Sequence, residues 1–146
     1  MTSPDGEARI RVVIADDHPR YRSSLRIVMT LDGDIEVVGE AGDGYEAVDL
    51  AVSVRPDVVV IDKQMPRLDG IDAARAITER IPGSRVLMLT MSDLPVDLHL
   101  AIEAGVAGFL YKDASGDEVA EAVRSIHRGD GVFPPHVRPQ AVSERT

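Results

Sequence analysis

Five side chains that could carry out phosphoryl chemistry stand where apolar segments of this 146-residue chain end. Asp16, Asp17 and Asp62 follow two such segments, and Thr90 and Lys112 stand at the ends of two later ones. Carboxylates held together repel each other, and Mg²⁺, which prefers oxygen ligands, relieves that repulsion. A carboxylate can attack phosphorus, while hydroxyl and ammonium groups bind phosphoryl oxygens. The set therefore predicts in-line phosphoryl transfer to an aspartate at a magnesium site.

The elements that must position these residues alternate between short aliphatic runs and segments with helical periodicity. The aliphatic runs predict five strands, at residues 10–15, 35–41, 58–61, 85–90 and 108–111. Helices are expected at 19–31, after the capping pair Asp43 and Glu46, at 71–81, at 96–104, and after the capping box Ser115 and Glu118.

The fold class follows from this alternation. Short strands that are apolar throughout are buried on both faces, which indicates a parallel sheet covered by helices on each side. We expect a doubly wound α/β fold with five parallel strands in the order 2-1-3-4-5. In that arrangement the strand order reverses between the first and third strands, at the topological switch point. Asp16, Asp17 and Asp62 should therefore meet at the carboxyl edge of the sheet.

Composition excludes several classes of protein. The chain has 16 basic and 25 acidic side chains, a net charge of −9, which opposes nucleic-acid binding by this chain alone. It has no cysteine, so disulfides, thiolate zinc sites and cysteine nucleophiles are ruled out. Without an apolar leader or a run of about 20 apolar residues, a cytoplasmic protein without membrane contact is expected.

The chain is expected to hold one folded domain. Residues 1–8 are predicted to be a flexible N-terminus, residues 9–128 the domain, and residues 129–146 a proline-containing linker. Only two lysines, Lys63 and Lys112, occur beside 14 arginines. A lysine kept at a strand end favours a site that needs a compact ammonium group.

Taken together, the polar motifs resemble the receiver domain of two-component response regulators. They are Asp16-Asp17, Asp62-Lys63-Gln64-Met65-Pro66 with Asp69-Gly70, Thr90, and Lys112-Asp113. The resemblance covers roughly residues 9–128, most of the chain. Two stretches resemble the NarL/FixJ (LuxR-type) subfamily in particular: Ala15-Asp16-Asp17-His18-Pro19 and Gly108-Phe109-Leu110-Tyr111-Lys112-Asp113.

The resemblance implies a role for each residue of the acidic group. Asp62 would be the phosphoacceptor, and a sensor histidine kinase would supply the phosphoryl group. Asp16 and Asp17 would help Asp62 to bind Mg²⁺, and the backbone carbonyl of Gln64 would complete the protein ligands.

The resemblance also implies a conformational switch. Lys112 would contact the phosphoryl oxygens, Thr90 would be the switch hydroxyl, and Phe109 the switch aromatic, turning inward behind Thr90. The output would be phosphorylation-modulated homodimerisation and control of a DNA-binding helix-turn-helix domain. This chain stops at Thr146, before such a domain could form, so a truncated form is favoured over a stand-alone receiver.

Some residues depart from the family pattern or have no assigned role. Lys63 stands where relatives often have an apolar residue, and strand alternation should point it away from Asp62 toward solvent. The alternative is that Lys63 tunes Mg²⁺ affinity or the approach of the phosphodonor. Met91 follows Thr90 where a small residue is common, and it could narrow the path into the site or merely fill space. His18 is expected to be a solvated loop residue or the entry to a helix, rather than a metal ligand. Leu100 and His127 are candidates for a dimer surface.

Three other functions compete with this one. A phosphorylation-independent receiver that acts as an interaction module remains the main alternative. A phosphohydrolase with an aspartyl-phosphate intermediate is disfavoured, because Gln64 stands where such enzymes commonly need a general acid. Flavin or nucleotide binding is disfavoured because no glycine-rich loop follows the first strand.

Overall fold

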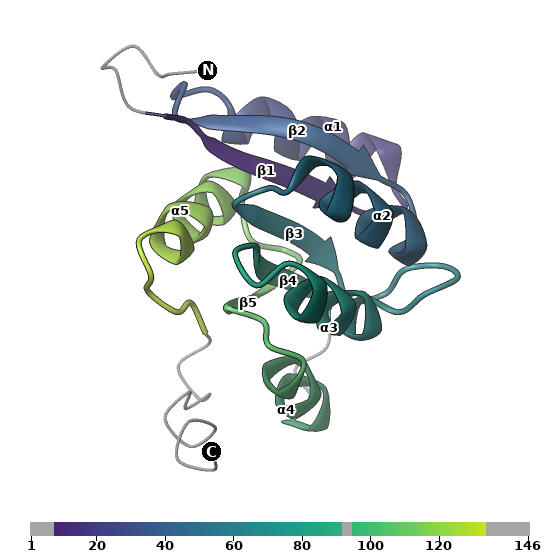
Figure 1. The fold of residues 1–146 in the computed structure, drawn as a ribbon. Coiled ribbons are helices and arrows are strands. Elements are labelled where there is room, and N and C mark those ends of the chain that lie inside the picture. Colours follow the sequence, from purple (N-terminus) through teal and green to yellow (C-terminus); the bar gives the residue numbers. More distant parts are fainter. Residues whose placement is uncertain (1–7, 92–94, 134–146) are drawn as a thin grey trace.

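The computed structural model describes residues 8–91 and 95–133 and shows five strands, each followed by a helix (Figure 1). The strands are β1 (Ile10–Ala15), β2 (Ile35–Ala41), β3 (Val58–Asp62), β4 (Arg85–Thr90) and β5 (Gly108–Tyr111). The helices are α1 (Pro19–Met29), α2 (Gly44–Val54), α3 (Gly70–Arg80), α4 (Pro95–Glu103) and α5 (Gly116–His127).

All neighbouring strands pair in parallel, in the order β2-β1-β3-β4-β5. This confirms the predicted doubly wound sheet. Figure 1 shows α2 and α3 on one face of the sheet and α1 and α5 on the other. The carboxyl ends of β1 and β3 are therefore adjacent at the point where the strand order reverses.

Burial on both faces explains why the strands are aliphatic throughout. All five residues of β3 are buried. Val59 and Ile61 belong to the core cluster under α2, α3 and α4, whereas Val58 and Val60 belong to the one under α1 and α5. Successive side chains thus enter opposite cores, as the two-residue repeat of a strand requires.

Helix capping fixes where α2, α3 and α5 begin. The Asp43 side chain accepts a hydrogen bond from the Glu46 amide at 2.9 Å, and Ser115 and Glu118 form a reciprocal capping box, which confirms both predicted starts. Asp69 caps α3 by accepting from the Ile71 amide at 2.7 Å. The helix predicted to reach residue 31 ends at Met29.

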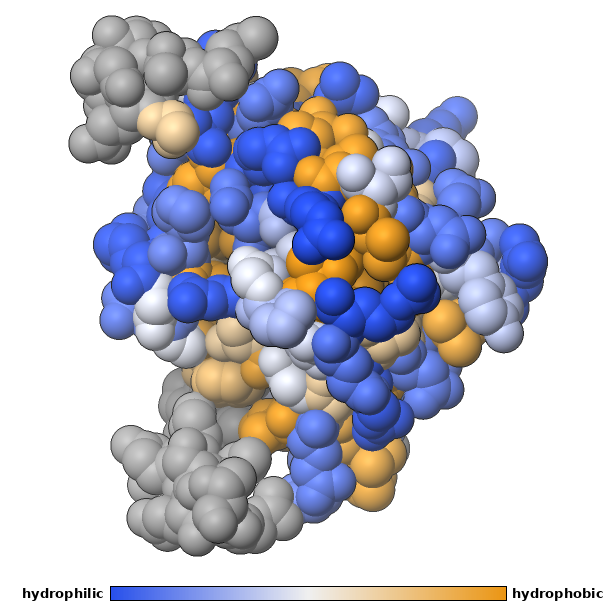
Figure 2. All heavy atoms as spheres, in the orientation of Figure 1, coloured by the Kyte–Doolittle hydropathy of each residue, from blue (hydrophilic) through white to orange (hydrophobic). Residues whose placement is uncertain are grey.

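The visible face of the molecule carries many charged and polar side chains (Figure 2). On the face shown in Figure 2, apolar side chains are visible in limited patches between charged and polar ones. The large apolar side chains that are exposed include Ile27, Leu31, Tyr45, Met91, Val96 and Leu100. Among the described residues, no helix has the length and apolar character needed to cross a membrane.

Part of the segment predicted to be a linker packs against the domain. The Phe109 amide donates to the Val132 carbonyl at 2.6 Å, and the Val132 amide donates to the Ala107 carbonyl at 3.3 Å. Val132 and Phe133 also pack against the two core clusters. The chain thus turns back after α5 because the edge of β5 offers unpaired backbone groups. Residues 1–7 and 134–146, predicted to be flexible terminus and linker, lie outside the described residues.

Candidate functional site

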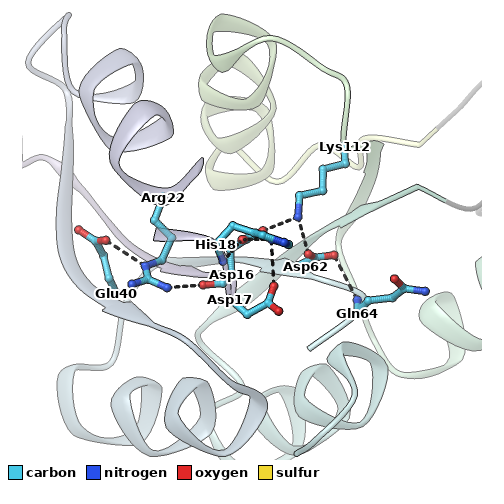
Figure 3. Close-up of polar contacts among 8 residues, drawn as sticks. All are labelled: Asp16, Asp17, His18, Arg22, Glu40, Asp62, Gln64 and Lys112. Atoms are coloured by element: carbon cyan, nitrogen blue, oxygen red, sulfur yellow. Dashed lines mark hydrogen bonds and ion pairs between the residues drawn. The ribbon is translucent and has the colours of Figure 1, made fainter. Parts of the chain in front are cut away.

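The sheet brings three of the predicted site residues into direct contact. Asp16 follows β1, Asp62 ends β3 and Lys112 follows β5. Lys112 Nζ lies 2.6 Å from Asp62 Oδ2 and 2.7 Å from Asp16 Oδ2 (Figure 3). One ammonium group therefore joins two carboxylates that are 46 residues apart in the chain and meet only through the strand order.

Local hydrogen bonds hold Asp16 in place. The Asp16 amide donates to the Ala41 carbonyl at 3.0 Å, and Asp16 Oδ1 accepts from the His18 amide at 2.7 Å. The Arg22 guanidinium donates to the Asp16 carbonyl and contacts Glu40 at 3.3 Å (Figure 3). The first loop is thus fixed from β2 and α1 before any ligand binds.

The acidic group has a donor set that suits a hard divalent cation. One ligand atom from each of Asp16, Asp17, His18 and Asp62 lies within 4.8 Å of the others. Asp16 and Asp62 are buried, whereas Asp17 and His18 are exposed. Three carboxylates, two from the loop after β1 and one from the end of β3, fit Mg²⁺, whose preferred ligands are oxygens.

His18 stands at the N-cap of α1, which confirms the predicted helix entry, and its ring also contacts the acidic group. Its Nδ1 lies 3.1 Å from Asp16 Oδ1 and 3.0 Å from Asp17 Oδ1, although its side chain is 66% exposed. The ring therefore contacts both carboxylates of the first loop, at oxygens that a cation would also use.

Burial and hydrogen bonding act in opposite directions on the two carboxyls. Burial raises the pKa of Asp62 above its usual range, although hydrogen bonds from Lys112 and the Gln64 amide oppose the rise. In Asp16, burial is outweighed by hydrogen bonds from Lys112 and the His18 amide, so the pKa lies below its usual range. Burial lowers the pKa of Lys112, but its bonds to both carboxylates reverse this and raise it. Of the two buried carboxyls, Asp62 holds a proton more readily.

The loop after β3 folds tightly over the strand end. The Gln64 amide donates to Asp62 Oδ1 at 3.1 Å, and the Gly70 amide donates to the Lys63 carbonyl at 2.8 Å. A Cβ atom on Gly70 would lie 2.2 Å from the Asp62 carbonyl oxygen. Only glycine allows α3 to begin this close to Asp62.

Thr90 and Phe109 lie beside this group. Thr90 ends β4 and is 1% exposed, whereas Phe109 is completely buried. Phe109 belongs to the same core cluster as Leu98 and Ala101 of α4, so its ring points inward, into the core, in this structure. A cavity of about 490 Å³ opens next to Thr90; its lining includes Thr90, Met91, Tyr111, Lys112 and Asp113.

The structure corrects two interpretations. Lys63 does not point into solvent: its side chain is only 14% exposed, and Nζ lies 3.7 Å from Asp97 Oδ1. Strand alternation turns Lys63 away from Asp62, but the first turn of α4 covers that side. Met91 is 85% exposed, so it fills no internal space and stands at the edge of the cavity. Leu100 and His127 are exposed, and their place in a dimer stays a prediction.

Sequence reasoning also missed Tyr21 as part of the site. Lys112 Nζ lies 4.9 Å from the centre of the Tyr21 ring, a cation–π distance. Burial raises the pKa of the Tyr21 hydroxyl, and this oxygen has no hydrogen-bond partner among the described residues. Nothing in the residues near Tyr21 indicates that Lys112 lies above its ring, so its part in the site follows only from the fold.

Comparison with known proteins agrees with this geometry. The profile of the family described as response regulator receiver domain matches residues 12–124. The chain is 38% identical over 136 residues to the transcriptional regulatory protein YxjL of Bacillus subtilis, covering 93% of this chain and 62% of YxjL. It is 38% identical over 135 residues to the transcriptional regulatory protein NarL of Mycobacterium tuberculosis, covering 92% of this chain and 62% of NarL. The chain therefore spans less than two thirds of these relatives.

Solved structures show the same architecture. The signal receiver domain of NarL from Mycobacterium tuberculosis superposes with a TM-score of 0.80 at 38% identity, covering 84% of this chain and 98% of that domain. A LuxR-family two-component response regulator from Aurantimonas sp. SI85-9A1 gives a TM-score of 0.83 at 31% identity, covering 94% of this chain and 99% of that one. Sequence, fold and the acidic edge of the sheet agree: the chain belongs to the receiver domains of two-component response regulators, in the NarL/FixJ (LuxR-type) subfamily.

Proposed function

We propose that Asp62 accepts a phosphoryl group from a phosphohistidine of a sensor histidine kinase. The observation that carries this proposal is the placement of Lys112 Nζ between Asp62 and Asp16, at 2.6 and 2.7 Å. A cation held at that point can follow the Asp62 carboxylate when it gains a phosphoryl group, because charge-assisted hydrogen bonds favour the more anionic partner.

The residues that would hold Mg²⁺ are Asp16, Asp17, Asp62 and the backbone carbonyl of Gln64. The close carboxylate oxygens support this assignment. When bound, Mg²⁺ would neutralise the charge of the phosphoryl oxygens and of the carboxylates around them.

The transfer itself needs an ionised Asp62. A carboxylate oxygen of Asp62 attacks phosphorus, the P–N bond to the donor histidine breaks, and the electron pair of that bond leaves with the imidazole. The Lys112 ammonium favours ionised Asp62 and then binds a phosphoryl oxygen, and the Thr90 hydroxyl donates to another. Water later attacks the acyl phosphate, which restores the carboxylate and releases inorganic phosphate.

The output proceeds through Thr90 and Phe109. When Thr90 binds the phosphoryl group, it keeps open the space behind it that the Phe109 ring can occupy, so phosphorylation raises the population of the inward ring seen here and of the α4–β5 arrangement that goes with it. This arrangement controls homodimerisation. In longer relatives of this chain it would control a DNA-binding effector domain.

Intact-mass measurement after incubation with acetyl phosphate tests the acceptor. The native chain should gain one phosphoryl group in the presence of Mg²⁺ and much less without it, whereas Asp62→Asn should gain none. Asp72→Asn is the matched control, because Asp72 is an exposed carboxylate on α3. Labelling of Asp62→Asn would contradict the assignment. A native chain that is never labelled, by acetyl phosphate or by a phosphorylated kinase, would favour the phosphorylation-independent interaction module.

A further inference from the structure

Lys63, the residue directly after Asp62, forms an ion pair with helix α4. Lys63 Nζ lies 3.7 Å from Asp97 Oδ1, in the first turn of α4. The two side chains are only 14% and 19% exposed, so the pair is largely shielded from water. Shielding strengthens an ion pair relative to one on the open surface.

The backbone of Lys63 has little freedom to move by itself. Its amide donates to the Leu89 carbonyl of β4 at 2.8 Å, and its carbonyl accepts from the Gly70 amide of α3 at 2.8 Å. Its side chain therefore extends from a point fixed to Asp62, β4 and the start of α3. A displacement of the Asp62 strand end would be passed to Lys63 and, through the ion pair, to Asp97.

Helix α4 depends on this attachment more than α3 or α5 would. Among its described residues only Leu98 and Ala101 are buried, whereas five residues are buried in each of α3 and α5. Leu98 and Ala101 share a core cluster with Phe109. The position of α4 and the inward ring of Phe109 are thus parts of one packed unit.

We propose that Lys63 is a positioning residue: its ion pair with Asp97 couples the phosphoacceptor strand to α4 and stabilises the arrangement in which Phe109 is inward. This inference rests on the proposed function of Asp62. It assigns Lys63 and Asp97 to the conformational response, and neither residue touches the phosphoryl group.

A fluorescent probe on α4 can test the coupling. The chain has no cysteine, so Val96→Cys, at a site that is 59% exposed, gives a single labelling position. Beryllofluoride with Mg²⁺ serves as the phosphoryl mimic, and its half-saturating concentration is read from the probe. Lys63→Met and Asp97→Asn should each raise this concentration about two- to fivefold, as expected for a partly shielded ion pair. The double variant should show no further rise, and Lys63→Arg should restore most of the response.

A matched double-mutant cycle uses Asp72 and Arg75, an exposed pair on α3 at 3.3 Å. Asp72→Asn and Arg75→Met should leave half-saturation unchanged. Equal half-saturation in native, Lys63→Met and Asp97→Asn proteins would overturn the coupling, as would additive effects or a fall in half-saturation. Lower thermal stability without a shift in half-saturation would show a merely structural pair and also overturn it. If the native protein fails to respond to beryllofluoride and is not labelled by acetyl phosphate, the proposed function itself fails.

Discussion

Lys112 Nζ and Asp62 Oδ2 are 2.6 Å apart, and Asp62 shares this ammonium with Asp16. The two carboxylates are almost completely buried, whereas the Lys112 side chain is 15% exposed. Lys112 thus neutralises part of the negative charge of Asp16 and Asp62. A cation that binds at this edge of the sheet would meet carboxylates whose charge is already partly compensated.

Replacing Lys112 by methionine should therefore destabilise the domain. Two buried carboxylates would lose their common cation, which costs roughly 1–3 kcal/mol after allowance for solvent screening at the partly exposed ammonium. Urea unfolding at neutral pH measures the difference, and Mg²⁺ should recover part of it. Arg75→Met, which removes an exposed cation, should change stability by less than about 0.5 kcal/mol. Equal losses in the two variants would contradict the special position of Lys112.

Asp62→Asn should stabilise the metal-free domain at neutral pH. Because burial raises the pKa of Asp62 in the folded state, the folded protein holds this proton more tightly than the unfolded chain does. Stability is therefore lost as the pH rises from the ordinary value of 3.8 through the folded value, and asparagine avoids the loss.

Urea unfolding of native and Asp62→Asn proteins between neutral pH and pH values below 3.8 checks this sign. The advantage of asparagine should shrink on acidification, and Mg²⁺ should stabilise the native protein more than the variant. A variant that is less stable than the native protein throughout would show that Asp62 favours folding when ionised.

Asp43 should show the opposite pH dependence. A hydrogen bond from the Glu46 amide, with help from Arg67, holds the pKa of Asp43 below its ordinary value of 3.8. Its contribution is present above that value and is lost as the pH falls through the folded pKa. Asp43→Asn keeps a capping oxygen without the charge. Its thermal unfolding temperature should be below that of the native protein at neutral pH and should converge with it in acid. A constant difference would exclude the titration of Asp43 as the cause.

Gly70→Ala should damage both folding and phosphorylation. The new Cβ would lie 2.2 Å from the Asp62 carbonyl oxygen and 2.8 Å from Lys63 Cα, so the start of α3 must move away from the site. Such overpacking costs about 1–3 kcal/mol, and labelling by acetyl phosphate should slow. Gly83→Ala is the matched control, because a Cβ there meets nothing within 4 Å. Unchanged labelling and stability in Gly70→Ala would show that the loop adapts freely.

The sequence predicted the elements and their order because the relevant signals are local. An aliphatic run marks β3, and Asp62 ends that run, so its place at the carboxyl edge follows from the strand alone. The capping oxygens of Asp43 and Ser115 lie within three residues of the amides that they accept. Such short-range patterns can be recognised in the sequence without knowledge of the tertiary structure.

The residues that were misjudged depend on contacts across the fold. Strand alternation gives the side of the sheet on which Lys63 lies. Whether that side is exposed to solvent depends on the packing of α4, which the sequence near Lys63 does not indicate. The contact between Lys112 and the Tyr21 ring joins the end of the sheet to α1, and nothing near either residue in the sequence indicates its partner. The roles of Asp62, Thr90, Lys112 and Phe109 remain predictions for the experiments above.

The backbone hydrogen bond from Phe109 to Val132 holds the segment that follows α5 against β5. Val132 and Phe133 pack against opposite core clusters, so the described segment after α5 lies along β5 next to Phe109. A twist of β5 at Phe109 would therefore also move Val132, through the backbone bond that joins them. The backbone bonds of Val132 occupy main-chain groups of Ala107 and Phe109 that a strand from another molecule would need for pairing with β5. Among the described elements, β2 is then the remaining edge strand of the sheet.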